Sequence, residues 1–462
     1  MTGARPRGRI PAHRPGAPRA APSAVAVAAA AGAVACAVLA AGCGSTPAPG
    51  AAAGAASAAG PPPLASSVTT TGGTSWAVLE MGGSRAEHNN FWQLLARPAG
   101  GSRWALATPP GVADNGGLVA APLGSRGLVA GFNPSQDLTF SPLATTRDGG
   151  AHWAPGLLPA GLAAVPSALA AGPGGRMLAL TGQGRVQASG PSGAGGGGGG
   201  GGPAWTALTS LAALARTPAG RACGLTGLTS AAFSPAGAPM LAGTCSRPGV
   251  TGIFSFTGGG WHAAGPVRPA ALAHRRVTVL RLAPAGSRTL ALLSTVPASA
   301  PGGAAAGTGT SGTGTSGTGT AGTGTAGTGT ADTGTAGGSA QVLAAWAPAD
   351  GPWVLSAPLT LGGKAVISTA AGPGGTAGVV VGTGLGATVT PVNHTGEATA
   401  AAPWHQLPAL PAHSADLVLG PATQVSSLAP DGSLLVSWRL SGTGTWVRQQ
   451  VMKVPVPLGS SG

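Results

Sequence analysis

The sequence predicts an all-β protein, because turn-forming residues divide it into short apolar runs. Its 462 residues include 84 Gly and 43 Pro, which leaves little room for long helices. The apolar runs come in pairs, and a Pro-x-Gly turn separates the two members of most pairs. Proline presets φ for such a turn and glycine accepts a positive φ, so each pair is typical of a β-hairpin.

The hairpin pattern recurs along the chain. A weaker copy begins at Ser67 and has Thr71 where the others have proline. Regular recurrence of one supersecondary unit is the signature of a repeat architecture. The six full copies begin at Leu118, Ala168, Ala231, Leu280, Ile367 and Val425.

A tryptophan follows most of these turns at a near-constant distance. Trp153, Trp205 and Trp404 each lie 31 or 32 residues after the proline of the preceding turn. Trp104, Trp261 and Trp353 hold comparable positions, the last once the Gly-Thr tract 307–338 is set aside. Each unit is therefore a hairpin, a third strand and a tryptophan-bearing fourth strand. Seven four-stranded antiparallel units predict a seven-bladed β-propeller.

The predicted propeller spans residues 66–457. It includes two insertions of low-complexity sequence, at about 190–203 and 302–339, which we expect to be disordered loops. Residues 458–462 form a tail. The last unit is short, because Trp446 follows Pro430 by only 16 residues and falls on a third strand. We expect the segment from Pro63 to Thr71 to complete that blade, since paired chain ends leave no open edge.

The N-terminus resembles the signal peptide of bacterial lipoproteins. A basic leader precedes the apolar run Ala24–Ala41, and Leu39–Cys43 reads LAAGC. The resemblance implies a signal peptide at 1–42, a lipid on the Cys43 thiol, and a protein anchored on the extracytoplasmic face of the cell membrane. Cys36 is a weaker candidate for the lipid. The alternative is an uncleaved membrane anchor, because about 18 apolar residues nearly span a bilayer.

Residues 43–65 form a tether, since they are rich in Ala, Gly and Pro and have no periodicity. Beyond them the chain has two cysteines, Cys223 and Cys245. Outside the cytoplasm, an isolated pair is more often a disulfide than a metal site. The sequence therefore predicts a disulfide between them.

The formal charge is +14, but its distribution does not favour nucleic-acid binding. Five arginines precede the apolar run of the leader, and only Arg275 and Arg276 are adjacent in the rest of the chain. The arginines therefore do not form a basic stripe that could contact the successive phosphates of a nucleic acid.

One stretch, Thr146–Trp153, carries a motif of the form S/T-x-D-x-G-x-x-W. It resembles the Asp-box of the BNR repeat family, which includes sialidases, sortilin-like receptors and photosystem-assembly-factor-like propellers. The resemblance implies a structural turn between the third and fourth strands of a blade, with roles for Thr146, Asp148, Gly150 and Trp153. Asp148 would accept turn N–H groups, and Trp153 would bury its ring between blades.

Enzymatic residues are sparse. The sialidase resemblance would require a tyrosine nucleophile, and the chain contains no tyrosine. For a glycosidase that uses two carboxylates, the nearest local pairs are Glu80 with Glu87 and Asp416 with Asp431. The histidines lack metal-ligand spacing, so we expect no metal, no cofactor and no catalytic residue.

The sequence therefore favours a non-enzymatic binding or scaffold module for an envelope protein or glycan, with membrane lipid as a further partner through Cys43. The alternative is a glycan-acting hydrolase or lyase, and a structural spacer is a third class. Carboxylates or several arginines that converge on the central funnel would favour the enzyme.

Overall fold

The computed structural model describes the strands of one compact unit, residues 59–462. The predicted signal peptide, Cys43, the tether, the tail and nearly all of both predicted insertions lie outside the described residues. The described residues are 67–82, 90–101, 104–110, 118–132, 143–156, 166–190, 205–266, 269–298, 339–349, 351–381, 385–389, 401–407, 416–419, 424–428, 434–440 and 446–453.

Three of the sheets contain four antiparallel strands in sequential order. The first comprises β5 (Leu118–Leu123), β6 (Gly127–Phe132), β7 (Leu143–Thr146) and β8 (Ala154–Gly156). The second comprises β9 (Pro166–Ala171), β10 (Met177–Thr181), β11 (Arg185–Ser189) and β12 (Trp205–Ser210). The third comprises β26 (Asp416–Leu419), β27 (Gln424–Leu428), β28 (Leu434–Leu440) and β29 (Trp446–Lys453).

Two larger sheets each consist of two antiparallel groups. In one, β1 (Val68–Thr69), β2 (Ser75–Gly82), β3 (Asn90–Arg97) and β4 (Ala105–Leu106) join β22 (Val366–Ala371), β23 (Ala377–Val381), β24 (Leu385–Val389) and β25 (His405–Gln406). In the other, β13 (Leu225–Phe233), β14 (Pro239–Cys245), β15 (Gly252–Thr257) and β16 (Gly260–Ala263) join β17 (Arg275–Ala285), β18 (Arg288–Pro297), β19 (Gln341–Pro348), β20 (Val354–Leu355) and β21 (Leu359–Thr360).

Each larger sheet is held together at a single residue pair. Val68 of β1 pairs with Ala371 of β22, and Thr244 of β14 pairs with Thr278 of β17. Within each group the pairing is extensive, so the four-stranded antiparallel unit predicted from the repeats is confirmed. The repeat tryptophans lie at or directly before the fourth strands, as their spacing predicts: Trp104, Trp153, Trp205, Trp261, Trp353 and Trp404.

The hydrophobic core is divided into layers between consecutive groups. One cluster packs Trp76 and Leu94 of the first group against Leu128 of β6. The next packs Val129 of β6 against Ala179 of β10. Three further clusters join β9–β11 to β13–β15, β13–β16 to β17–β19, and β17–β19 to β22–β24. The four groups that begin at β5, β9, β13 and β17 are therefore buried on both faces, which explains their nearly continuous apolar strands.

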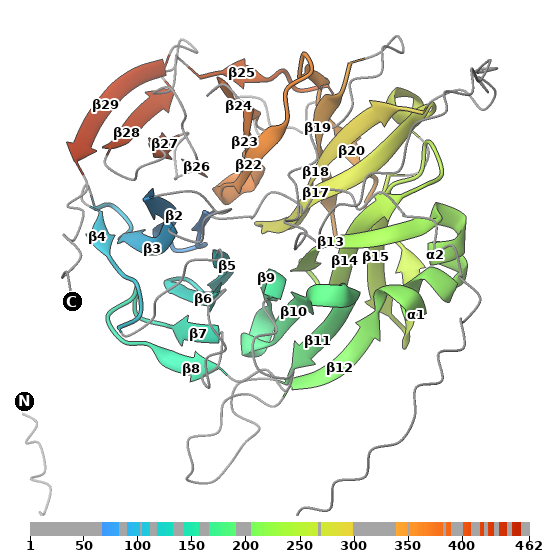
Figure 1. Cartoon of the computed structure of the whole chain (residues 1–462), viewed down its shortest axis with the longest axis horizontal. Coiled ribbons are helices and arrows are strands. Elements are labelled where there is room, and N and C mark those ends of the chain that lie inside the picture. The colour runs from blue at the N-terminus through green and yellow to red at the C-terminus, as the bar shows by residue number, and fades with distance from the viewer. Residues whose placement is uncertain are drawn as a thin grey trace, which may run out of the picture. The chain divides into compact units, whose positions relative to one another are not determined.

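The first strands of successive groups contact one another: β5 contacts β9, β9 contacts β13, and β13 contacts β17. The strands β9, β13 and β17 run in the same direction. Thr229 and Ser230 of β13 bond to Val279 and Leu282 of β17 in the same order, and Gly172 at the end of β9 packs on Phe233 at the end of β13. Figure 1 shows these strands turned toward the middle of the unit, with later strands outside them. The unit is an all-β, propeller-like arrangement.

The last sheet corrects the sequence prediction that it lacks a strand. It contains four strands of its own, the first of which is Asp416–Leu419, so Trp446 begins the fourth strand, β29, and not a third one. The described part of the segment Pro63–Thr71, from Ser67 on, does not pair with it, since β1 pairs with β2 and β22. The N-terminal segment still contacts this sheet, because Thr69 Oγ1 donates to the Leu419 carbonyl over 2.6 Å.

Two short helices, α1 (Leu211–Arg216) and α2 (Pro218–Cys223), connect β12 to β13. Ser210 and Thr217 cap them, each accepting a backbone N–H. Cys223 at the end of α2 forms the predicted disulfide with Cys245 at the end of β14, and the Cα atoms are 5.1 Å apart. In the part of the chain described, no helix is long and apolar enough to cross a membrane.

We expect the Cys223→Ser, Cys245→Ser double variant to unfold more easily. The bridge spans 22 residues, and closing a loop of that size stabilises the native state by about 3 kcal/mol in the chain-entropy model. Urea unfolding followed by tryptophan fluorescence measures the change. An equal midpoint for wild type and variant would contradict a stabilising bridge.

Candidate functional site

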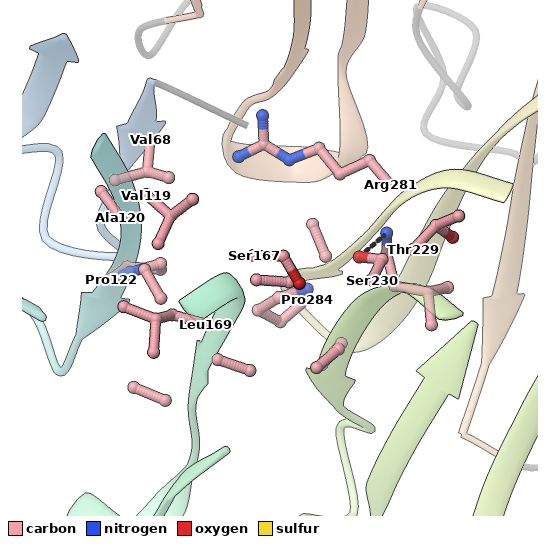
Figure 2. A pocket seen from close by; sticks show the side chains of 18 of the residues that line it. Val68, Val119, Ala120, Pro122, Ser167, Leu169, Thr229, Ser230, Arg281 and Pro284 are labelled. Atoms are coloured by element: carbon pink, nitrogen blue, oxygen red, sulfur yellow. Dashed lines mark hydrogen bonds between the residues drawn. The ribbon is translucent and has the colours of Figure 1, made fainter. Parts of the chain in front are cut away.

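A small pocket lies between the first strands of the groups. Its walls come from β1, β5, β9, β13 and β17, and include Val68, Ala120, Leu169, Ala231 and Leu280. Figure 2 shows Val68, Ala120 and Leu169 on the strands that surround the pocket. The cavity volume is about 50 Å³, whereas pockets for drug-sized ligands measure about 300–1,000 Å³. The pocket has room for little more than water.

One charged side chain, Arg281, lies among the residues that line this pocket. It is 5% exposed. Its guanidinium donates to the Thr369 carbonyl of β22 over 2.6 Å and to the Ser67 carbonyl before β1 over 3.1 Å. Arg281 therefore ties the start of the described chain and β22 to β17.

The hydroxyls at the pocket also serve contacts between groups. Ser230 Oγ accepts the backbone N–H of Leu282 over 2.9 Å, a bond drawn in Figure 2. Thr229 Oγ1 donates to the Val279 carbonyl. These polar groups hold β13 against β17, so they stabilise the centre of the unit.

The structure does not bring the predicted carboxylate pairs together at this pocket. No Asp or Glu is among the described residues that line it. Glu80 lies on β2 and Asp416 begins β26, while Glu87 and Asp431 lie outside the described residues. The part of the chain described also holds no group of three metal-ligating side chains.

The Asp-box-like stretch forms the connection between β7 and β8. Asp148 Oδ1 accepts the Thr146 hydroxyl at 2.9 Å and the His152 backbone N–H at 3.0 Å. Thr146 Oγ1 in turn accepts the Gly150 N–H at 3.0 Å. His152 Nδ1 lies 2.6 Å from Asp148 Oδ2 and donates to it, because an ionised carboxylate only accepts.

This turn packs against the neighbouring group. Gly150 has φ 94°, and a Cβ there would lie 2.9 Å from Ala107 Cβ and 3.3 Å from the Trp76 ring. Trp153 meets Trp76 edge to face with ring centroids 6.2 Å apart. The Asp-box-like residues thus stabilise the turn between β7 and β8 and its packing on the neighbouring group. They lie away from the strands that line the pocket.

The hydrogen bonds from His152 and Thr146 also change the pKa of the Asp148 carboxyl. The pKa of its carboxyl lies well below the ordinary value, first because the His152 backbone N–H donates to it, and further because the His152 ring and Thr146 hydroxyl donate to it. A lowered pKa in the folded state stabilises the fold above the unfolded pKa of about 4. That contribution is lost as the pH falls toward the folded pKa.

Sequence reasoning did not single out Arg281. Its signal is an arginine inside the apolar run of Val277–Ala285, where every other side chain is apolar or Thr. Such a position on a predicted inner strand indicates a buried charge with internal acceptors. The acceptors themselves are 88 and 214 residues away in sequence, so only the fold identifies them.

Comparisons with known proteins give structural likenesses only. No family model matches the chain, and no curated protein sequence matches it. Among solved structures, YCF48 from Cyanidioschyzon merolae is 15% identical with a TM-score of 0.41, covering 82% of this chain and 97% of that one. A structure of YCF48 bound to D1 peptide is 13% identical with a TM-score of 0.40, covering 82% and 94%. The periplasmic gluconolactonase PpgL of Pseudomonas aeruginosa is 11% identical with a TM-score of 0.45, covering 82% and 96%. Likeness at this level transfers no activity and no ligand.

Replacing Arg281 with Met is expected to lower the free energy of unfolding by about 2 kcal/mol or more, because two buried carbonyls lose a charged donor. Urea unfolding measures it. Arg185→Met is the control, because Arg185 is exposed and surface changes cost about 0.5 kcal/mol or less. Equal losses in the two variants would contradict a central role for Arg281.

Asp148→Asn is expected to lower thermal stability at pH 7 and to reduce the difference in stability between pH 7 and pH 3. The wild type gains stability as its carboxyl ionises, whereas the amide does not titrate. Thermal unfolding at both pH values tests this. A variant that loses as much stability on acidification as the wild type would show that Asp148 does not contribute.

Proposed function

We propose that this chain is a membrane-anchored, extracytoplasmic seven-bladed β-propeller that serves as a non-enzymatic binding or scaffold module for an envelope protein or glycan. The observation that carries the proposal is the composition of the central pocket. The residues that line it are apolar or small, apart from an arginine and hydroxyls engaged in internal hydrogen bonds.

Support for seven blades comes from the contacts between strand groups. The two larger sheets are each joined at one residue pair only, so each counts as two blades. The inner-strand contacts continue from β17 to β22, from β22 to β26, and from β26 to β1 and β2, while β1 also contacts β5. A ring of this kind leaves no inner strand without neighbours on both sides.

The proposal of binding without catalysis is supported by the residues that line the pocket. Glycoside hydrolysis commonly requires two carboxyl groups about 5–9.5 Å apart across the bond to be cleaved. The described lining contains none. The connections between strands are free to vary in such a fold, and they are where we place partner recognition.

The proposed location rests on the N-terminal sequence. The run Ala24–Ala41 followed by LAAGC at 39–43 is the pattern of a lipoprotein leader. The predicted disulfide partners do form a bridge, which is compatible with an oxidising compartment.

Anchoring is tested by expressing the full-length chain in a bacterium fed an alkyne fatty acid. We expect the wild type and Cys36→Ser to carry the label and to partition with membranes, and Cys43→Ser to lose the label. Label retained in Cys43→Ser and lost in Cys36→Ser would move the lipid to the other cysteine. No label in any of the three proteins would overturn lipid anchoring.

Binding is tested by probing envelope glycans on an array and by capturing envelope proteins with the full-length chain in detergent. The retained glycans are then examined for new reducing ends or unsaturated products. Retention without product formation supports the module. Product formation at a rate that depends on chain concentration would favour the hydrolase or lyase and overturn the proposal.

A further inference from the structure

Acidic residues are missing from a long stretch of the chain. No Asp or Glu occurs between Asp148 and Asp332, and the same stretch contains ten arginines. It builds β9 to β18 and both helices. Asp332 itself lies outside the described residues. This part of the unit therefore carries positive charge and contributes no acid to balance it.

Strand direction places five of these arginines at one end of the groups. The inner strands β9, β13 and β17 run the same way, since β13 and β17 bond in the same order and the ends of β9 and β13 meet at Gly172 and Phe233. The five side chains lie on segments at the end where these strands begin. All five are exposed. We call them the cationic rim: Arg185, Arg216, Arg221, Arg247 and Arg276.

The segments that carry the rim are joined in sequence from one group to the next. The turn before Arg185 contacts α1, where a Cβ on Gly184 would lie 2.6 Å from Leu211 Cβ. Arg216 ends α1, and its carbonyl accepts a hydrogen bond from the Arg221 guanidinium of α2. Arg185, Arg216 and Arg221 thus lie along one continuous path.

The path continues through the disulfide. The bridge from Cys223 to Cys245 fixes α2 to the connection that follows β14. There the Arg247 N–H donates to the Cys223 carbonyl over 3.2 Å. Gly249 N–H then donates to the Arg275 carbonyl over 2.9 Å, which places this connection beside Arg276 at the start of β17. The rim spans three neighbouring strand groups.

Within the described residues, no ion pair with a carboxylate engages any of the five rim arginines. Like charges held at one end raise the local potential and attract anions. Guanidinium groups bind phosphate and carboxylate through two parallel N–H donors, so an arginine set suits these oxyanions.

We propose that the cationic rim binds an anionic polymer of the cell envelope through phosphate or carboxylate groups repeated along it. The proposal rests on the function proposed above, because it names a ligand class for the same binding module. A linear polymer fits a path of cations that runs across successive groups. A bilayer fits less well, since in the described part of the chain Val296, which pairs with Arg276, is the one exposed large apolar side chain beside the rim.

The test measures binding of fluorescent inorganic polyphosphate and of fluorescent polygalacturonate to the full-length chain, by anisotropy at several NaCl concentrations. The two probes distinguish phosphate from carboxylate recognition. We expect Arg247→Gln, Arg276→Gln to weaken binding about tenfold and to reduce the slope of log affinity against log salt by about 1 to 2. Arg216→Gln, Arg221→Gln is a second variant on the helices, with the same expectation.

The matched control is Arg126→Gln, Arg288→Gln, which removes the same number of charges at the opposite ends of β5 and β17. We expect it to change affinity by less than about twofold. Equal weakening by control and rim variants would mean that net charge alone binds the probe, and would overturn the proposal. Stronger binding to vesicles of anionic phosphatidylglycerol or to duplex DNA would also overturn it.

The two proposals fail in different ways. If the rim variants bind both probes like the wild type while the array still retains a ligand, the rim inference is wrong and the module stands. If the chain cleaves a retained glycan while the rim variants alone lose probe binding, the rim inference stands and the non-enzymatic function is wrong.

Discussion

The groups that begin at β5, β9, β13 and β17 each have two faces to bury, and the neighbouring groups bury them. The layers between groups are built from small side chains close to the inner strands, such as Ala170, Ala231 and Ala283. Glycines bring the groups still closer. A Cβ on Gly131 would lie 2.4 Å from Pro166, and one on Gly172 would lie 2.5 Å from the Phe233 ring. The Ala and Gly residues at these positions thus allow close packing between the groups.

Toward the outer strands the groups diverge, and larger side chains fill the space. Trp353 and Trp404 stand at equivalent places, and the indole N–H of each donates to a carbonyl just after the fourth strand of the preceding group, Ala264 and Ala357 respectively. Aromatic rings with a polar edge suit such positions, since the ring excludes water and the N–H finds an acceptor. The same contact between groups thus recurs at these two tryptophans, whereas the indole N–H groups of Trp153 and Trp205 are buried without an acceptor in the described part of the chain.

These contacts explain which parts of the structure could be predicted from sequence. The hairpins were predictable because Pro-x-Gly turns are local, and the fourth strands because tryptophan marks them. The strand Asp416–Leu419 was missed, since its four residues are too short for a periodicity and no Pro-x-Gly turn follows them. The disulfide followed from cysteine number. Arg281 and the cationic rim depend on partners far apart in sequence, so the chain alone did not group them.

Polar side chains have different roles at the centre and at the ends of the unit. At the centre, the polar atoms of Thr229, Ser230 and Arg281 serve to join neighbouring strands, and a residue altered for a ligand there would loosen several groups at once. At the ends, exposed side chains such as Arg216, Arg221 and Arg247 extend outward from the connections. Successive connections between antiparallel strands lie at opposite ends of a group. The position of an arginine relative to the start of its strand therefore decides at which end its charge lies. Scattered arginines in the sequence thereby become neighbours at one end, where binding can change without cost to the core.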